Sequence, residues 1–367
     1  MSNYDYARIP DWAHLRERYL AAWEKRVLDD RIMAHIQNPT FGRPEPEPWM
    51  LEASADKYLD PAKLLKLTTW RRTAWHWQID LFEYRVPSYG PNVFIGFCGA
   101  QPVFGENTVW HDPLISSLDE ADKVHFDEDN RYWRAHLEAL YYFSEHCAGD
   151  VQLAATDFGG PTDWIAAVMG TENFLMETIA RPEEMRDFAL RLVAECNQAY
   201  DLMYPIVTSR NDGICDWIPI WSDRPMGTVQ DDMAINFSPA MYQEVFMPAI
   251  RLMAAHTEHT VLHWHDGAAQ HLDNLLKVDE IDLVKFGHDP NSPPYLELLP
   301  LMQRIQAVGK VLFIGIVEAK DAESFLMNLD PRGLYMIIET TDDEATLRME
   351  EKVRQLTRQR LDELGPT

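Results

Sequence analysis

The sequence contains few cysteines, and no two of them lie close together. Its 367 residues include four, namely Cys98, Cys147, Cys196 and Cys215, and none belongs to a CxxC motif. Metal knuckles and dithiol redox motifs place their cysteines in close pairs. We therefore exclude both kinds of site and expect buried free thiols.

Positive charge is also scarce. The chain has 33 Lys and Arg residues against 59 Asp and Glu, which gives a formal net charge of -26. Nucleic acids and anionic membrane surfaces repel such a protein unless a basic stripe offsets the charge locally. The sequence shows no such stripe, so we expect neither partner.

Long hydrophobic runs are absent. No stretch approaches the roughly 20 apolar residues that cross a bilayer. The first residues, MSNYDYARIPDWAHLRERYL, lack the basic and then apolar pattern of a signal peptide. We expect a cytoplasmic protein.

Glycine-rich phosphate loops are missing as well. Neither GxGxxG nor GxxxxGK[ST] follows the first predicted strand, which argues against dinucleotide-binding and P-loop folds. The chain does have 46% hydrophobic and 25% charged residues. A chain of this length and composition buries a large core, as ordinary enzymes do.

Short β-rich runs alternate with helical periodicity over most of the chain, and this alternation is typical of parallel strands. Eight strands followed mostly by helices favour a single (β/α)8 TIM barrel. The predicted strands are 31–37, 151–156, 213–220, 233–236 (MAIN), 260–265, 283–286, 310–316 and 334–339.

Two helix starts are recognisable. Ser238 before Pro239 supplies a capping hydroxyl and a proline suited to the first turn. Thr341 and Glu344 match the capping box, which predicts a C-terminal helix through Leu361.

We predict a single domain spanning residues 1–367. Two of its segments depart from the alternation of strands and helices. Residues 1–30 are predicted to form a helical N-terminal extension. Residues 38–120, rich in Pro, Trp, Tyr and Gly, form a long insertion after the first strand. Since that position lies at the rim where barrel active sites are built, the insertion is a candidate lid.

The strongest local pattern is His263-Trp264-His265-Asp266, at the end of a predicted strand. Residues two apart in a strand face the same way, so the two histidines point together. Paired neutral imidazoles suit zinc or another divalent transition metal, with Asp266 as a ligand, an orienting group or a general base. The alternative is a histidine pair satisfied by core hydrogen bonds.

A third metal ligand is expected from another strand end. Glu339, His288 and Glu318 each follow a predicted strand. A carboxylate would complete a site of two histidines and one glutamate, and an imidazole would complete a site of three histidines; Glu339 is our preferred third ligand. Its alternative role is to position the start of the following helix.

Carboxylates at other strand ends are candidates for proton transfer. Asp157 precedes a Phe-Gly-Gly-Pro turn, and Asp231 and Asp232 precede MAIN. Neighbouring carboxylates raise each other's proton affinity and so provide an acid and a base. Asp157, Asp232 and Asp266 are our predicted catalytic residues, although one member of a pair usually faces solvent.

Substrate-binding candidates are drawn mainly from aromatic residues near strand ends, together with Gln37 and Arg224. Aromatic side chains in such proteins also serve as plain packing. The candidate pocket walls are Trp110, Trp164, Trp217 and Trp221.

Several segments together carry a family resemblance. FGGPTDWIAAVMGTENFLMETIARPEEM, MAINFSPAMYQEVFMPAI, LHWHDG and GKVLFIGIV resemble, in order and spacing, the uroporphyrinogen decarboxylase superfamily over about residues 150–360. The resemblance implies a (β/α)8 barrel and a homodimer. The superfamily includes decarboxylases and zinc-dependent corrinoid methyltransferases, so the resemblance implies one of these activities.

Authentic uroporphyrinogen decarboxylases are characterised by an Arg-Gln-Ala-Gly-Arg motif that holds the carboxylates of their substrate. The matching stretch here is HIQNPTFGRPEPEP, in which Arg43 is the one arginine. A highly anionic porphyrinogen would be repelled by so acidic a protein. The resemblance therefore points away from that activity.

The methyltransferase branch binds zinc through a His-x-Cys pair and a later cysteine. Anchored on the first histidine, the resemblance places His263 at the family histidine and His265 at the cysteine; anchored on Asp-Gly, it places Trp264 at the histidine. No cysteine follows Cys215, so Glu339 is the positional substitute. Imidazole and carboxylate ligands make a harder metal that suits polarising an oxygen atom.

Three functions follow as hypotheses. The first is metal-assisted methyl transfer or demethylation of a small oxygenated substrate, with any corrinoid supplied by a partner protein. The second is metal-independent decarboxylation or lyase chemistry on a small acid held by Arg71, Arg72 or Arg224. The third is a non-catalytic barrel that binds a ligand or docks a corrinoid protein.

Overall fold

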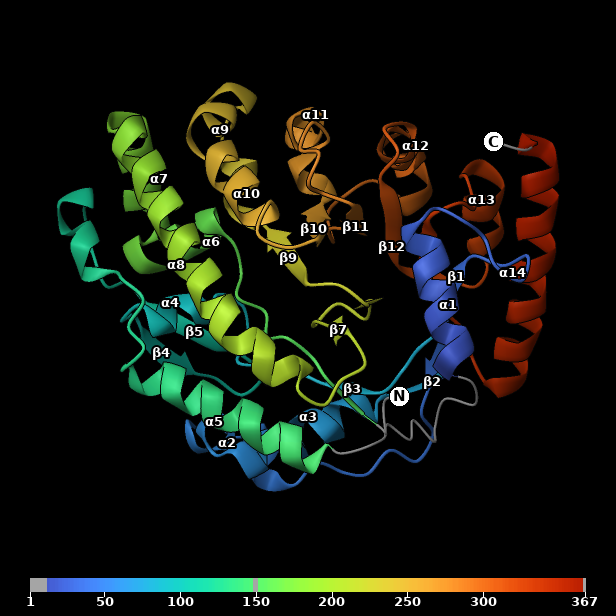
Figure 1. Cartoon of the computed structure of the whole chain (residues 1–367), viewed down its shortest axis with the longest axis horizontal. Coiled ribbons are helices and arrows are strands. Elements are labelled where there is room, and N and C mark those ends of the chain that lie inside the picture. Colours follow the sequence, from blue (N-terminus) through green and yellow to red (C-terminus); the bar gives the residue numbers. More distant parts are fainter. Residues whose placement is uncertain (1–11, 148–150, 366–367) are drawn as a thin grey trace.

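The computed structural model describes residues 12–147 and 151–365. The protein has a mixed α/β fold with a mostly parallel sheet, and its helices lie around the strands as an outer layer (Figure 1). Residues 1–11 of the predicted N-terminal extension lie outside the described part. Helix α1, Trp12–Trp23, occupies most of the remainder of that extension.

In the described part of the chain, seven strands make the main sheet. All neighbours are parallel except β2, which runs antiparallel to β1. In spatial order the strands are β2 (Trp75–Ile79), β1 (Met33–Pro39), β13 (Leu334–Glu339), β12 (Val311–Glu318), β11 (Leu283–Gly287), β10 (His259–His265) and β9 (Met226–Gln230).

Six shorter strands form three two-stranded sheets. They are β3 (Tyr84–Arg85) with β6 (Gln152–Leu153), β4 (Gln101–Phe104) with β5 (Val109–Asp112), and β7 (Ile214–Cys215) with β8 (Trp221–Ser222). A parallel bridge between Ala155 and Asp216 joins the β6 and β7 segments. Among the described residues these ladders stay separate from the main sheet, so the closed eight-stranded barrel remains a prediction.

The helices between the strands vary from one turn to 27 residues. The α-helices are α2 (Asp56–Leu59), α3 (Pro61–Arg72), α4 (Val93–Phe97), α5 (Arg131–His146), α6 (Pro161–Met169), α7 (Thr171–Ala180), α8 (Pro182–Thr208), α9 (Pro239–Val245), α10 (Met247–Ala254), α11 (Leu272–Leu275), α12 (Leu299–Ala307), α13 (Ala322–Asn328) and α14 (Asp343–Leu364). The 3-10 helices are η1 (Pro48–Leu51), η2 (Leu118–Lys123), η3 (Asp232–Asn236), η4 (Asp266–His271) and η5 (Tyr295–Leu298).

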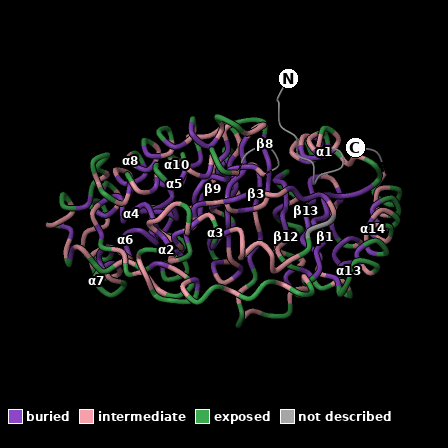
Figure 2. Tube along the Cα trace, turned by 90° about the horizontal axis from the view of Figure 1, so that it is seen from below, coloured by how far each residue is buried: buried purple, intermediate pink, exposed green. Residues whose placement is uncertain are grey.

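The central strands are buried on both faces. β10 is buried at five consecutive positions, and β13 likewise. Continuous burial is expected of parallel strands that are covered by helices on one side and face other strands on the other. The buried trace accordingly runs through the middle of the molecule, with exposed segments at its edge (Figure 2).

The later strands confirm the sequence prediction closely, but the MAIN strand is wrong. Those residues belong to η3, whose first backbone N–H groups, on Asp232 and Met233, donate to the Asp163 carboxylate at 2.9 Å each. The strand next to β10 is instead β9, just before them.

The cap of the C-terminal helix also differs from the prediction. Asp342, and not Thr341, accepts the backbone N–H of Ala345 at 2.8 Å and so begins α14. Ser238 caps α9 as predicted, by accepting from Met241 N at 3.2 Å. The predicted insertion, residues 38–120, contains α2 to α4, β2 to β5, η1 and the start of η2.

A buried ion cluster attaches α1 to the sheet. Asp80 accepts from Arg18 at 2.9 Å and from Arg31 at 2.6 Å, and all three side chains are almost fully buried. Asp80 also accepts a hydrogen bond from the backbone N–H of Ala34 in β1, at 3.1 Å. The N-terminal helix is therefore held by charge as well as by apolar packing.

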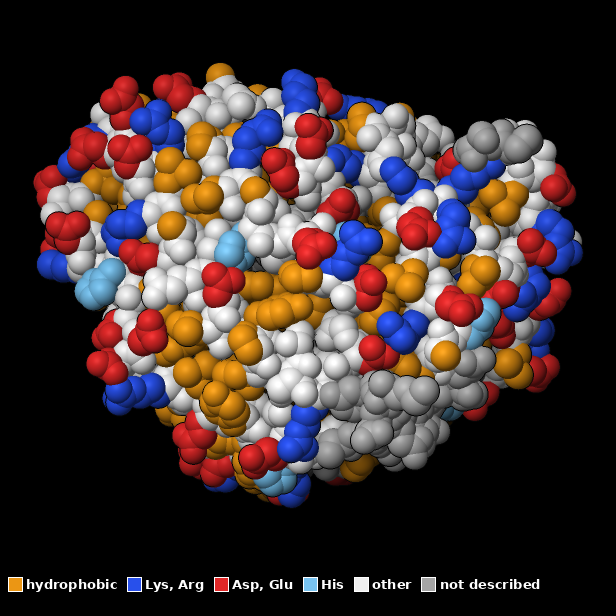
Figure 3. All heavy atoms as spheres, in the orientation of Figure 1, with side chains coloured by type: hydrophobic (Ala, Val, Ile, Leu, Met, Phe, Trp, Pro, Cys, Tyr) orange, Lys and Arg blue, Asp and Glu red, His pale blue; other side chains and the backbone are white. Residues whose placement is uncertain are grey.

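Two surface properties bear on partners. None of the helices in the described part of the chain has both the length and the apolar character needed to cross a membrane. On the face shown in Figure 3, Lys and Arg side chains are interspersed with Asp and Glu and form no continuous basic band.

Candidate metal centre at the end of strand β10

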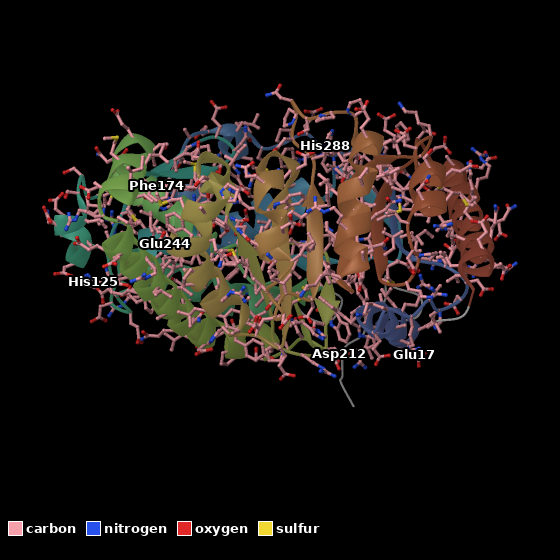
Figure 4. The ribbon with its side chains drawn as sticks, turned by 90° about the horizontal axis from the view of Figure 1, so that it is seen from above. Glu17, His125, Phe174, Asp212, Glu244 and His288 are labelled. Carbon is pink, nitrogen blue, oxygen red and sulfur yellow. The ribbon has the colours of Figure 1, made fainter. Side chains whose placement is uncertain are left out.

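The candidate site lies where β9, β10 and β11 end and their loops begin. Because the three strands are parallel, their carboxyl ends meet at one edge. Figure 4 shows His288, which follows β11, at this edge, whereas Asp212 and Glu17 lie at the opposite edge. Residues that follow these strands are thereby brought together.

Asp232, His263 and His265 form a compact group. One potential ligand atom of each lies within 4.8 Å of the others. The two Nε2 atoms of the histidines are 3.0 Å apart, and their rings are nearly perpendicular, at 89°. The prediction that the two histidines point together is confirmed.

Asp289 orients the second histidine. Its Oδ1 lies 2.7 Å from Nδ1 of His265, and its Oδ2 accepts the backbone N–H of Gly267 at 3.1 Å. A proton on Nδ1 of a neutral imidazole leaves the lone pair on Nε2. That lone pair therefore lies beside Nε2 of His263, in the arrangement typical of metal-binding histidines.

Burial keeps the first histidine neutral. It is 8% exposed, and burial lowers the pKa of His263 well below its usual value, with Lys285 and His265 acting in the same direction. A neutral imidazole is the form that binds a metal ion. The Nδ1 atom of His263 is buried and has no hydrogen-bond partner within the described ranges.

Asp232 completes the group. The residue as a whole is exposed, but its carboxyl group is largely surrounded by protein, and this burial raises the pKa of Asp232. Asp289 also raises this pKa, whereas His265 and Lys285 lower it. Two imidazoles and one carboxylate are a donor set found in catalytic zinc sites and in non-haem iron sites. The residues present therefore fit a divalent transition metal.

Asp266 belongs to a neighbouring network instead. Its oxygens accept from Nδ1 of His288 at 2.8 Å, from the Ser292 hydroxyl at 2.6 Å and from Asp289 N at 3.2 Å. Burial alone would raise the pKa of Asp266, but these hydrogen bonds lower it. An ionised, fully bonded carboxylate is suited to orienting the loop, and less suited to moving a proton.

Two cavities border the histidines. One of about 270 Å³ is lined by Asp232, His263, His265 and Asp289. The other, of about 450 Å³, is lined by Trp217, His265, Lys285, His288 and Tyr295. Both spaces adjoin the Asp232, His263 and His265 group, which is the one potential metal-binding group of this kind among the described residues.

Glu339 lies away from this group. Its Oε1 accepts from Nε2 of Gln37 at 3.0 Å, because the ends of β13 and β1 are paired. Two strands, β12 and β11, separate β13 from β10. The structure thus brings Asp232 to the histidines in place of the predicted glutamate, and Gln37 is paired with that glutamate.

The predicted pocket walls separate into two sets. Trp217 lines the larger cavity and packs edge-on against the His263 ring at 5.1 Å between centroids. Trp110 is 61% exposed on β5. Trp164 and Trp221 are fully buried core residues, and Trp221 packs against Trp12 of α1 at 5.7 Å.

The predicted arginines do not converge on the site. Arg224 precedes β9, at the start of the strand, and is 58% exposed near Asp223 and Glu258. Arg71 donates to the Asn107 carbonyl, and Arg72 donates to the Tyr84 hydroxyl at 3.2 Å. A carboxylate site built on these three side chains has no support from their positions.

Asp157 retains properties of a proton-transfer group. Burial raises its pKa to about 7; a hydrogen bond from Gly159 N, 3.0 Å long, opposes this shift, while Asp216 and Asp232 add to it. Asp231 is committed to structure, since it accepts from Thr162 N at 2.8 Å and from the Tyr242 hydroxyl at 2.7 Å.

Sequence reasoning missed Lys285, Asp289 and Gly287. Lys285 is the charged residue within the apolar run LVKF, and that interruption was a usable indication. Gly287 is paired with His265, and a Cβ there would lie 3.0 Å from the His265 ring. Glycine at this position makes room for the imidazole. No pattern in the sequence indicated that Asp289 contacts His265.

Comparison with known proteins supports the fold alone. No protein-family model and no curated protein matches the sequence. Among solved structures the chain is similar to a methyltransferase from Methanosarcina mazei, with a TM-score of 0.58 and 12% sequence identity. The similarity covers 93% of this chain and 98% of that one.

Proposed function

We propose that this protein is an enzyme that holds a divalent transition metal at Asp232, His263 and His265 and assists methyl transfer or demethylation of a small oxygenated substrate. The observation that carries the proposal is the approach of the three ligand atoms to within 4.8 Å at the end of β10. The protein shares its fold with a methyltransferase over nearly the whole chain, and for this reason methyl transfer is the type of reaction that we propose.

The metal, when bound, would act as a Lewis acid that polarises an ether or alkoxide oxygen. The residues of the chain have separate tasks. Asp289 fixes the tautomer of His265 through its 2.7 Å contact. Trp217 limits the movement of the His263 ring by edge-on packing. Both effects preorganise the donor atoms.

Proton transfer is assigned to Asp157. A carboxyl group with a pKa of about 7 exchanges protons readily near neutral pH. We assign Asp266 to loop positioning, because its oxygens accept hydrogen bonds from His288, Asp289 and Ser292 of the loop after β11. A corrinoid carried by a separate protein, as the sequence resemblance implies, would be the methyl acceptor or donor.

Metal analysis tests the proposal directly. Protein purified without chelator is expected to contain about one zinc or iron per chain, and His263→Ala is expected to lose it. Glu339→Ala is the matched control, because it removes a carboxylate from another strand end and should retain the metal. Metal-free wild-type protein that takes up none on titration would overturn the proposal.

A further inference from the structure

The cavity of about 450 Å³ beside His265 has an unusual lining. Its aromatic lining comes from the loop between β7 and β8 and from β11, η5 and β12, which contribute Trp217, Phe286, Tyr295 and Phe313 respectively. Its one charged side chain with an amino group is Lys285. Ligand pockets are typically apolar with a few polar groups that fix orientation, and this cavity has that composition.

Lys285 lies on the cavity side of the sheet. It pairs in register with His263 of β10 and with Phe313 of β12, so the three side chains point to the same face. Two glycines sit one layer further along, Gly287 on β11 and Gly315 on β12, and both line the cavity. The missing side chains leave space directly beyond the lysine.

Among the described residues, no Asp or Glu carboxylate oxygen lies within 4.0 Å of the ammonium group of Lys285. Burial lowers the pKa of Lys285, and the more distant Asp232 raises it. A partly buried cation without a partner is costly, and an anion that reaches it gains a poorly screened interaction.

The walls favour a flat ligand. The His288 and Tyr295 rings, which both line the cavity, are stacked at 4.6 Å between centroids and 15° between planes. Asp266 occupies Nδ1 of His288, so Nε2 is the nitrogen open to a ligand. Aromatic ligands gain from offset or edge-on contact with such rings.

We propose that this cavity binds a small aromatic carboxylate whose carboxylate pairs with Lys285 and whose opposite edge lies against His265. The inference rests on the proposed function in one respect, because His265 is common to the cavity and to the metal group. The substrate class of the metal site is accordingly an aromatic organic acid that bears an oxygen substituent.

Calorimetric titration with benzoate as the probe tests the inference. Wild-type protein stripped of metal with chelator is expected to bind benzoate at least about tenfold more tightly than benzamide, the neutral isostere. Lys285→Met should lose that preference. Lys320→Met is the matched control, since Lys320 is exposed and paired with Glu318, and it should bind benzoate as the wild type does.

Metal-free protein separates this inference from the proposed function. If the protein holds no metal but benzoate still depends on Lys285, the metal proposal fails and the carboxylate site stands. If Lys285→Met binds both metal and benzoate as well as the wild type does, the proposed carboxylate site is wrong and the metal proposal is unaffected. Lys285→Gln is a second variant, and unchanged thermal melting of either variant shows that folding is intact. No benzoate binding to wild-type protein also overturns the inference.

Discussion

Nδ1 of His265 lies 2.7 Å from Oδ1 of Asp289, a residue 24 positions later in the chain. The contact joins the end of β10 to the loop after β11 and fixes which nitrogen of His265 faces His263. A donor group is thereby prepared in advance, so that little rearrangement is needed when a ligand binds there.

Asp289→Asn is expected to weaken metal binding by roughly 10- to 100-fold without abolishing it, as replacement of such supporting carboxylates generally does. The amide lacks the charge that stabilises the bound imidazole. Competition with a chromophoric chelator measures the affinity. Asp273→Asn, which removes an exposed carboxylate paired with Arg304, is the control and should leave the affinity unchanged. Equal affinities for the two variants would contradict the assigned role of Asp289.

Gly287→Ala is expected to displace the His265 ring and weaken metal binding. Its Cβ would lie 3.0 to 3.1 Å from three atoms of the His265 ring, which is closer than ordinary contact. Gly315→Ala is the matched control, because its nearest neighbour, the Phe286 carbonyl oxygen, is 3.4 Å away. Metal titration of both variants decides the matter. A Gly287→Ala protein with wild-type affinity would show that the ring has room elsewhere.

The regular part of the fold was predictable because its strands are largely apolar and buried. Each of β10, β11, β12 and β13 contains a buried stretch, although Lys285 interrupts the one in β11 and the last residues of β12 are partly exposed. β9 was missed because Gly227 and Thr228 weaken its pattern, and the apolar residues of MAIN follow directly. Asp163, about 70 residues earlier, holds those residues in a 3-10 helix, and such a distant contact leaves no local pattern.

The histidine pair was predictable for a similar reason, since both members lie on one strand with a period of two. The third member was not, because it depends on strand order. Asp232 follows β9, the neighbour of β10, whereas Glu339 ends a strand paired with β1. The sequence contained both carboxylates but not the spatial order that decides between them.

Asp216 is expected to make stability fall with rising pH. Burial raises its pKa to about 7, although hydrogen bonds from Thr228 and from Ile218 N oppose the shift. A folded pKa above the unfolded value means that the native state binds more protons between about pH 4 and 7. Its contribution to the free energy of unfolding therefore decreases across that window, by at most about 1.4 kcal/mol per pH unit.

Urea denaturation from pH 4.5 to 7.5 measures this effect. Asp216→Asn removes the titrating group, so the difference in stability between variant and wild type should shift in favour of the variant as pH rises. Asp201→Asn is the control, because Asp201 is exposed and pairs with His256. A pH-independent difference for Asp216→Asn would contradict the assignment.

Asp80→Ala is expected to destabilise the protein by about 3–5 kcal/mol, because Arg18 and Arg31 would remain buried without their shared carboxylate. Burial alone would raise the pKa of Asp80, but the two arginines hold it below its usual value. The stabilisation is therefore present above the unfolded pKa of about 3.9 and is lost as pH falls through the lower folded value. Asp56→Ala breaks an exposed pair with Lys63 and should cost less than about 1 kcal/mol. Urea denaturation at neutral pH compares the two, and similar losses would show that the buried cluster adds no more than a surface pair.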